Sequence, residues 1–187
     1  MSNMILKAIK YASSKHKNEK RKVSGDPYIV HPFLVAELIR KYKKSKHMEE
    51  LIVAAILHDV LENTNTNFIE IATLFSPMVA SLVFELTSDK NEIKKLKEQY
   101  GDQAKNEYLK RKMLGMSSYA LVIKLCDRLA NIMDNPTEKY KKDTNELLSF
   151  LLTNRRISKT QKKIISDILK EIGDENVEWN EKTWRLY

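Results

Sequence analysis

Cysteine, glycine, proline and long apolar runs are all scarce in this chain. The shortage of cysteine and the lack of long apolar runs each exclude a class of protein. The single cysteine, Cys126, excludes an internal disulfide and a cysteine-based zinc site, and it fits a reducing compartment. No apolar run approaches the ~20 residues that span a bilayer. The amphipathic segment 1–17 does not resemble a signal peptide. We therefore expect a cytoplasmic protein without a membrane anchor.

The chain has 187 residues, a length typical of one domain, and we expect a single domain over 1–187. Its net charge of +8 favours anionic partners such as a nucleic acid, a membrane surface or a small polyphosphate. Lysine-rich stretches such as 40–46 and 138–143 also commonly solvate a surface, so charge alone does not choose a partner. Nucleic-acid binding as the primary function lacks support, because no helix-turn-helix, zinc finger or aromatic-basic segment is present.

Apolar residues recur at three- and four-residue spacing, and no strand-like alternation accompanies the four glycines and four prolines. This pattern predicts an all-α fold of about nine to ten helices. Asn65 or Thr66 is the expected cap of a short fourth helix, and Trp179 and Trp184 are expected to dock on the domain or on a second subunit of a homodimer. The helices are expected near 4–12, 32–39, 48–62, 67–75, 77–86, 91–115, 118–133, 138–153 and 158–172.

Two adjacent ionisable residues, His58 and Asp59, interrupt the strongly apolar segment AAILHDVLE. Burying both is costly unless something compensates them, and a bound cation compensates both, because imidazole nitrogen and carboxylate oxygen are ligands for divalent metals. Taken alone, the pair is better explained by a buried His–Asp hydrogen bond or by an exposed polar face of the helix.

Two other segments favour the metal interpretation. His31 lies at a loop-to-helix junction before Pro32, and Asp127 is a charge inside the apolar helix LVIKLCDRLANI. Two nitrogens and two oxygens leave roughly two positions of an octahedron for water and a phosphate oxygen, which suits a hydrolytic Mn²⁺ or Fe²⁺ site. The remaining histidines, His16 and His47, have lysine-rich neighbours and are expected on the surface.

A set of motifs between about residues 5 and 135 resembles the HD-type hydrolase domain of the RelA/SpoT alarmone family, and specifically its stand-alone small hydrolases. The motifs are RKVSGDPYIVHP, HPFLVAELI, AAILHDVLENT, FSPMVASLVFELT and IKLCDRLANI. The resemblance implies an HD-domain helical bundle and Mn²⁺-dependent removal of the 3′-pyrophosphate from (p)ppGpp, which yields GDP or GTP.

The resemblance also implies roles for individual residues. His31, His58, Asp59 and Asp127 match the family's ligands for one Mn²⁺ per chain. Glu62 matches an acidic residue that activates or orients the attacking water, and Asn63 occupies the second position of that catalytic pair. Arg21, Lys22, Ser24 and Asn131 match substrate-binding positions. In a continuous helix, Glu62 would share a face with His58, and Asn131 would share one with Asp127.

Two departures from the family pattern bear on activity. Asn63 replaces the second acidic residue, and an amide cannot accept a proton near neutral pH. Val23 is inserted into the usual Arg-Lys-Ser-Gly run, which affects the register of Arg21 and Lys22.

Two alternative functions follow from these departures. One is an HD phosphohydrolase that acts on another nucleotide, such as (p)ppApp or NADPH. The other is a non-catalytic nucleotide-binding module with a vestigial site. The presence of all four expected metal ligands argues against the second.

Overall fold

The computed structural model describes residues 2–22 and 24–173, and over these residues it contains helices and no strand. The only pairing of β type within them is an isolated bridge between Lys20 and Pro27. The all-α prediction is confirmed. The elements are α1 (Asn3–Lys15), α2 (Val30–Tyr42), α3 (Met48–Ile56), α4 (Val60–Asn63), α5 (Phe68–Leu74), α6 (Pro77–Leu86), α7 (Lys90–Tyr100), the 3-10 helix η1 (Gly101–Gln103), α8 (Ala104–Gly115), α9 (Ser118–Met133), α10 (Glu138–Asn154) and α11 (Lys159–Ile172).

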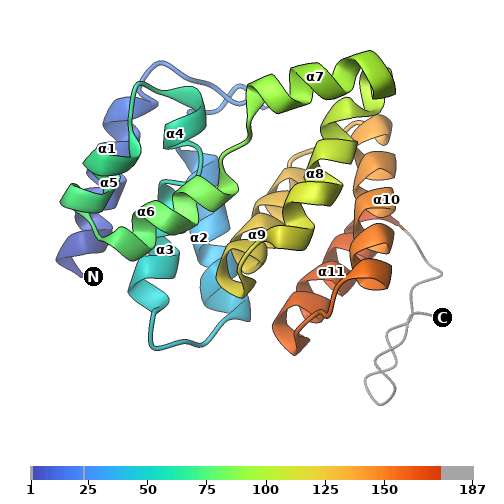
Figure 1. Ribbon diagram of the computed structural model, residues 1–187. Helices are drawn as coiled ribbons and strands as arrows, with labels where there is room; N and C mark the ends of the chain where they lie inside the picture. Colours follow the sequence, from blue (N-terminus) through green and yellow to red (C-terminus); the bar gives the residue numbers. More distant parts are fainter. Residues whose placement is uncertain (1, 23, 174–187) are drawn as a thin grey trace.

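Helices α2 and α9 pack against each other in the middle of the molecule (Figure 1). Helices α1, α3, α4, α5 and α6 lie on one side of this pair, and α7, α8, α10 and α11 lie on the other. Helix α9 is buried along most of its length because α2, α3, α6 and α11 all contact it. The helices that carry His31 and Asp127 are therefore those at the centre of the fold.

Several helix boundaries follow from local capping chemistry. Helix α6 begins with Pro77 after the N-cap Ser76, whose hydroxyl accepts a hydrogen bond from the Val79 N–H. Ser117 caps α9 in the same way, and Ser158 forms a capping box with Gln161 at the start of α11. The cap of α5 is Asn67, so the expectation of Asn65 or Thr66 was wrong by one or two positions.

The helix predicted over 48–62 is interrupted. Helix α3 ends at Ile56, and the chain makes a turn in which the Val60 N–H bonds the Leu57 carbonyl before the short α4 begins. His58 and Asp59 therefore lie in this turn between two helices and not inside one continuous helix.

The helix predicted over 91–115 is also interrupted, because Gly101 adopts a φ of 51° at the end of α7. The chain then passes through η1 into α8, which packs against α7 and α10. These two interruptions explain why the described residues form eleven α-helices instead of nine or ten.

No helix among residues 2–22 and 24–173 combines the length and the apolarity that crossing a membrane requires. The expectations for Val23, Trp179 and Trp184 concern positions outside these residues.

Candidate metal centre

Three separate elements bring His31, His58 and Asp127 together. His31 is the second residue of α2, His58 lies in the turn between α3 and α4, and Asp127 lies in the middle of α9. Each offers one ligand atom, and the three atoms lie within 4.8 Å of one another. All three side chains are buried, so this cluster of ionisable groups lies in the interior of the protein.

Asp59 adds a fourth group beside the cluster. Its Oδ2 lies 3.0 Å from the Nε2 of His58, and the Oδ1 of Asp127 lies 3.7 Å from the same nitrogen. The hydroxyl of Tyr28 donates a hydrogen bond to the Asp59 carboxylate, which fixes its orientation. The structure therefore gathers three of the four sequence-predicted ligands in one cluster and places the fourth, Asp59, against the His58 imidazole.

The His58 ring is oriented as a metal ligand requires. Its Nδ1 donates to the Ala55 carbonyl at 2.8 Å, so Nε2 is the nitrogen that can bind a cation after it loses its proton. This Nε2 is buried, and the Asp59 carboxylate 3.0 Å away is its ion-pair partner but is not placed to accept a well-formed hydrogen bond from it. A buried imidazole beside two carboxylates needs a proton or a cation on this nitrogen. A divalent cation fits this set of donors.

The electrostatics of the cluster favour a bound cation. Burial by itself lowers the pKa of His58, but the carboxylates of Asp59 and Asp127 outweigh it and raise this pKa to about 9. Burial raises the pKa of Asp59, and the neighbouring His58 more than reverses this effect. The raised pKa of His58 reports the negative charge of the two carboxylates around its ring, and a metal ion bound there would neutralise that charge in place of the proton.

Asp127 is held by two neighbours besides the histidines. The Lys124 ammonium lies 2.8 Å from Oδ2, and the Asn131 amide donates to Oδ1 at 2.8 Å and to the Asp127 carbonyl at 2.9 Å. Burial opposes ionisation of Asp127, but Lys124 and the two histidines hold its pKa well below the usual value. Supporting hydrogen bonds of this kind orient metal ligands.

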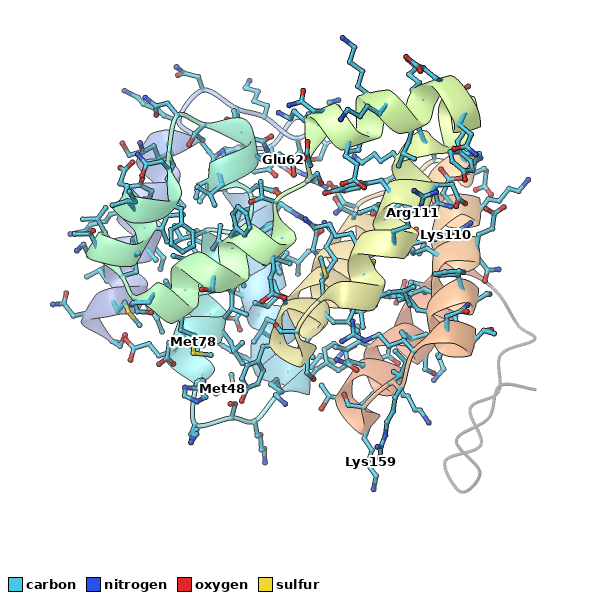
Figure 2. The ribbon with its side chains drawn as sticks, viewed as in Figure 1. Met48, Glu62, Met78, Lys110, Arg111 and Lys159 are labelled. Atoms are coloured by element: carbon cyan, nitrogen blue, oxygen red, sulfur yellow. The ribbon has the colours of Figure 1, made fainter. Side chains whose placement is uncertain are left out.

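Glu62 is outside the three-residue cluster and faces the connection between α6 and α7 (Figure 2). Its Oε2 accepts a hydrogen bond from the Ser88 N–H at 2.9 Å, and its backbone carbonyl accepts one from the Lys90 ammonium at 2.9 Å. The expectation that Glu62 shares a continuous helix face with His58 was wrong, because the chain turns between them. Asn63 is exposed at the end of α4.

The basic loop after α1 reaches this centre through Arg21. The guanidinium donates from Nη2 to the Asn131 side-chain oxygen at 2.9 Å and from Nε to Asp134 at 2.8 Å. Lys22 and Ser24 are exposed in the same loop. Sequence reasoning missed Asp134, although its spacing of seven residues from Asp127 and three from Asn131 puts the three residues on one face of α9.

The prediction that His16 is an ordinary surface residue was wrong. His16 follows α1 directly, is only 3% exposed, and packs on Tyr28 with ring centroids 4.8 Å apart. Its lysine-rich sequence neighbours indicated solvent, but the chain turns inward at the end of α1 and places the ring under Tyr28. His47 is partly exposed, with Nδ1 3.6 Å from a carboxylate oxygen of Glu50.

Comparison with known families identifies the class of this fold and site. The family model for the HD domain matches residues 8–151, and the chain belongs to this family. The resemblance seen in the motifs is thereby confirmed at the level of the HD domain.

Two individual relatives show which HD-domain proteins this chain is similar to. The zebrafish (Danio rerio) guanosine-3′,5′-bis(diphosphate) 3′-pyrophosphohydrolase MESH1 is 34% identical over 133 residues, which cover 70% of this chain and 68% of that protein. The GTP pyrophosphokinase rsh of Brucella melitensis is 37% identical over 132 residues, which cover 69% of this chain and 16% of that enzyme. The chain thus matches a complete small hydrolase over most of its length, but only about a sixth of the longer relatives.

Solved structures agree on the fold. A metazoan orthologue of SpoT, which hydrolyses ppGpp, superposes with a TM-score of 0.72 at 24% identity over 92% of this chain and 97% of its own. Lmo0812 from Listeria monocytogenes superposes with a TM-score of 0.58 at 16% identity over 81% of this chain and 99% of its own. The expected HD-domain helical bundle is confirmed.

Proposed function

We propose that this chain is a divalent-metal-dependent hydrolase that removes the 3′-pyrophosphate of (p)ppGpp, with Mn²⁺ as the preferred ion and Fe²⁺ as an alternative. The observation that carries the proposal is the buried cluster of ligand atoms from His31, His58 and Asp127, with the Asp59 carboxylate 3.0 Å from the Nε2 of His58. Among relatives, the small hydrolase from zebrafish supports the substrate assignment. A nucleotide substrate and one buried free cysteine are consistent with a cytoplasmic enzyme.

The four residues around the His58 imidazole would hold the ion, which supplies Lewis acidity and an acidified water when bound. In the reaction, water attacks the phosphorus that is bonded to the 3′-oxygen, the P–O3′ bond breaks, pyrophosphate leaves, and the 3′-oxygen takes up a proton from solvent to become a hydroxyl. Glu62 accepts the proton of the water on Oε1, while Oε2 remains hydrogen-bonded to Ser88. Asn131 and Arg21 orient the nucleotide, and Lys124 holds Asp127 in its ionised form.

A nucleotide panel tests this proposal directly. Purified protein is mixed with ppGpp, pppApp or NADPH in the presence of Mn²⁺, Mg²⁺ or a chelator, and the released products are separated by chromatography. We expect pyrophosphate release from ppGpp with Mn²⁺ and none with the chelator. Turnover of pppApp or NADPH but not of ppGpp would mean that the enzyme acts on another nucleotide. Tight binding of ppGpp without turnover would indicate a vestigial site.

The replacement Asn63→Asp is expected to raise kcat for ppGpp about tenfold, because it restores a carboxylate next to Glu62. Asn63 is exposed, so the change costs little stability. Steady-state rates with Mn²⁺ provide the measurement, and Asn65→Asp, which adds the same charge at a nearby exposed position, provides the control. An unchanged rate in Asn63→Asp would mean that Glu62 and the metal-bound water already suffice.

A further inference from the structure

Arg21 and Asp134 form a short, partly buried ion pair between the loop after α1 and the end of α9. The Nε and Nη2 atoms of Arg21 lie 2.8 and 2.6 Å from the same carboxylate oxygen of Asp134. The side chains are 16% and 25% exposed, so solvent screens this pair less than it screens a surface pair. Asp134 is the C-cap of α9. The sequence motifs that predicted the site gave it no role as a ligand or as a base.

The pair continues directly to a candidate metal ligand. Arg21 donates from Nη2 to Asn131, and the amide of Asn131 donates in turn to Oδ1 and to the backbone carbonyl of Asp127. Both ends of the Asn131 amide are therefore occupied, one by the guanidinium and the other by Asp127. Asp134 thus anchors a chain of hydrogen bonds that ends at the centre of the site.

The backbone around Arg21 is fixed separately by its own loop. The Arg21 N–H donates to the Asp26 carbonyl at 2.8 Å, the Gly25 N–H donates to the Arg21 carbonyl at 3.1 Å, and Lys20 pairs with Pro27. This closed loop holds the Cα of Arg21 but leaves the long side chain to choose its rotamer. The carboxylate of Asp134 selects one direction for it.

We propose that Asp134 is a positioning residue that fixes the Arg21 guanidinium for nucleotide binding, an inference that rests on the proposed function. Asp134 and Asn131 occupy the Nε and Nη2 edge of the guanidinium, and the Nη1 side, which no hydrogen bond from the described residues occupies, is assigned to a phosphate group. Asp134 also compensates the positive charge of the Arg21 guanidinium. Arg21 therefore contributes N–H donors in a fixed direction more than a general electrostatic attraction for anions.

Steady-state kinetics on ppGpp with Mn²⁺ test the inference. We expect Asp134→Asn to raise KM about fivefold and to leave kcat within about twofold, because a prealigned contact is lost while the chemistry is retained. In an Arg21→Ala background the same change should have no further effect on KM. Glu37→Gln removes the same charge from an exposed ion pair with Arg40 on α2 and should leave KM unchanged.

Two kinetic results would overturn the inference. A lower KM in Asp134→Asn would mean that the carboxylate restrains Arg21 from the substrate. An equal rise in KM with and without Arg21 would mean that Asp134 acts on the site by another route.

A measurement that does not depend on turnover separates this inference from the proposed function. In ¹⁵N-labelled protein, the Nε–H signal of Arg21 should exchange slowly with solvent, and Asp134→Asn should speed its exchange at least about tenfold. The signal is assigned by its loss in Arg21→Ala. Unchanged exchange would refute the positioning role. If the wild type turned over no nucleotide, the proposed function and the substrate part of this inference would fail, while faster exchange would still show that Asp134 fixes Arg21.

Discussion

Replacing His58 by alanine is expected to abolish metal-dependent turnover, with a loss on the order of 10³-fold or more in kcat/KM. Two of the four ligand-bearing side chains, Asp59 and Asp127, are placed around the Nε2 of this histidine at 3.0 and 3.7 Å. Without the imidazole, the carboxylates of Asp59 and Asp127 retain only His31 as a nitrogen donor. Initial rates measured over a range of Mn²⁺ concentrations provide the activity measurement.

The same variant should also lose metal affinity, and electron paramagnetic resonance of free Mn²⁺ reports this loss without reference to any substrate. The matched control is His47→Ala, because His47 is partly exposed before α3 and lies outside the ligand cluster. It should bind Mn²⁺ and turn over substrate as the wild type does. If His58→Ala bound Mn²⁺ with wild-type affinity, the ion would lie elsewhere and the proposed centre would be refuted.

The helices that the sequence predicts best are those whose apolar period and capping residues agree. Helix α6 begins at Ser76-Pro77 and α9 follows Ser117, as their local signals indicate. The interruption between α3 and α4 has no such signal, because the apolar pattern continues through Leu57 and Val60. The break coincides with His58 and Asp59, whose side chains contact groups from α2, α9 and the loop after α1, so it accompanies long-range contacts that the local pattern does not contain.

In the candidate site, too, the sequence predicts the features that depend on neighbouring residues and not those that depend on residues far apart in the chain. A His-Asp pair inside an apolar segment is visible in the sequence because it violates the expected pattern. The burial of His16 under Tyr28 and the pairing of Arg21 with Asp134 depend on residues that are distant in the chain. Arg21 and Asp134 are separated by 113 positions, and no spacing rule connects a loop to a helix end at such a distance.

Replacing Glu62 by glutamine is expected to lower kcat about 10²–10⁴-fold and to leave KM nearly unchanged, as is typical of the loss of a general base. Glutamine has nearly the same size and retains a side-chain oxygen that can accept the Ser88 N–H bond now made at 2.9 Å. It cannot accept a proton from water near neutral pH. Single-turnover rates with ppGpp and saturating Mn²⁺ isolate the chemical step from product release.

The contacts of Glu62 also allow a purely structural role, since the bonds to Ser88 and Lys90 join α4 to the start of α7. Glu62→Gln keeps the first bond and, because the second uses the backbone carbonyl, keeps that one too. Its melting temperature should therefore match the wild type, while Glu62→Ala should melt earlier because the Ser88 N–H loses its acceptor. Glu70→Gln, which alters a partly exposed carboxylate bonded to Tyr11, is the control for the change itself. Normal turnover in Glu62→Gln together with a lower melting temperature in Glu62→Ala would assign Glu62 to the structure and leave the proton to another acceptor.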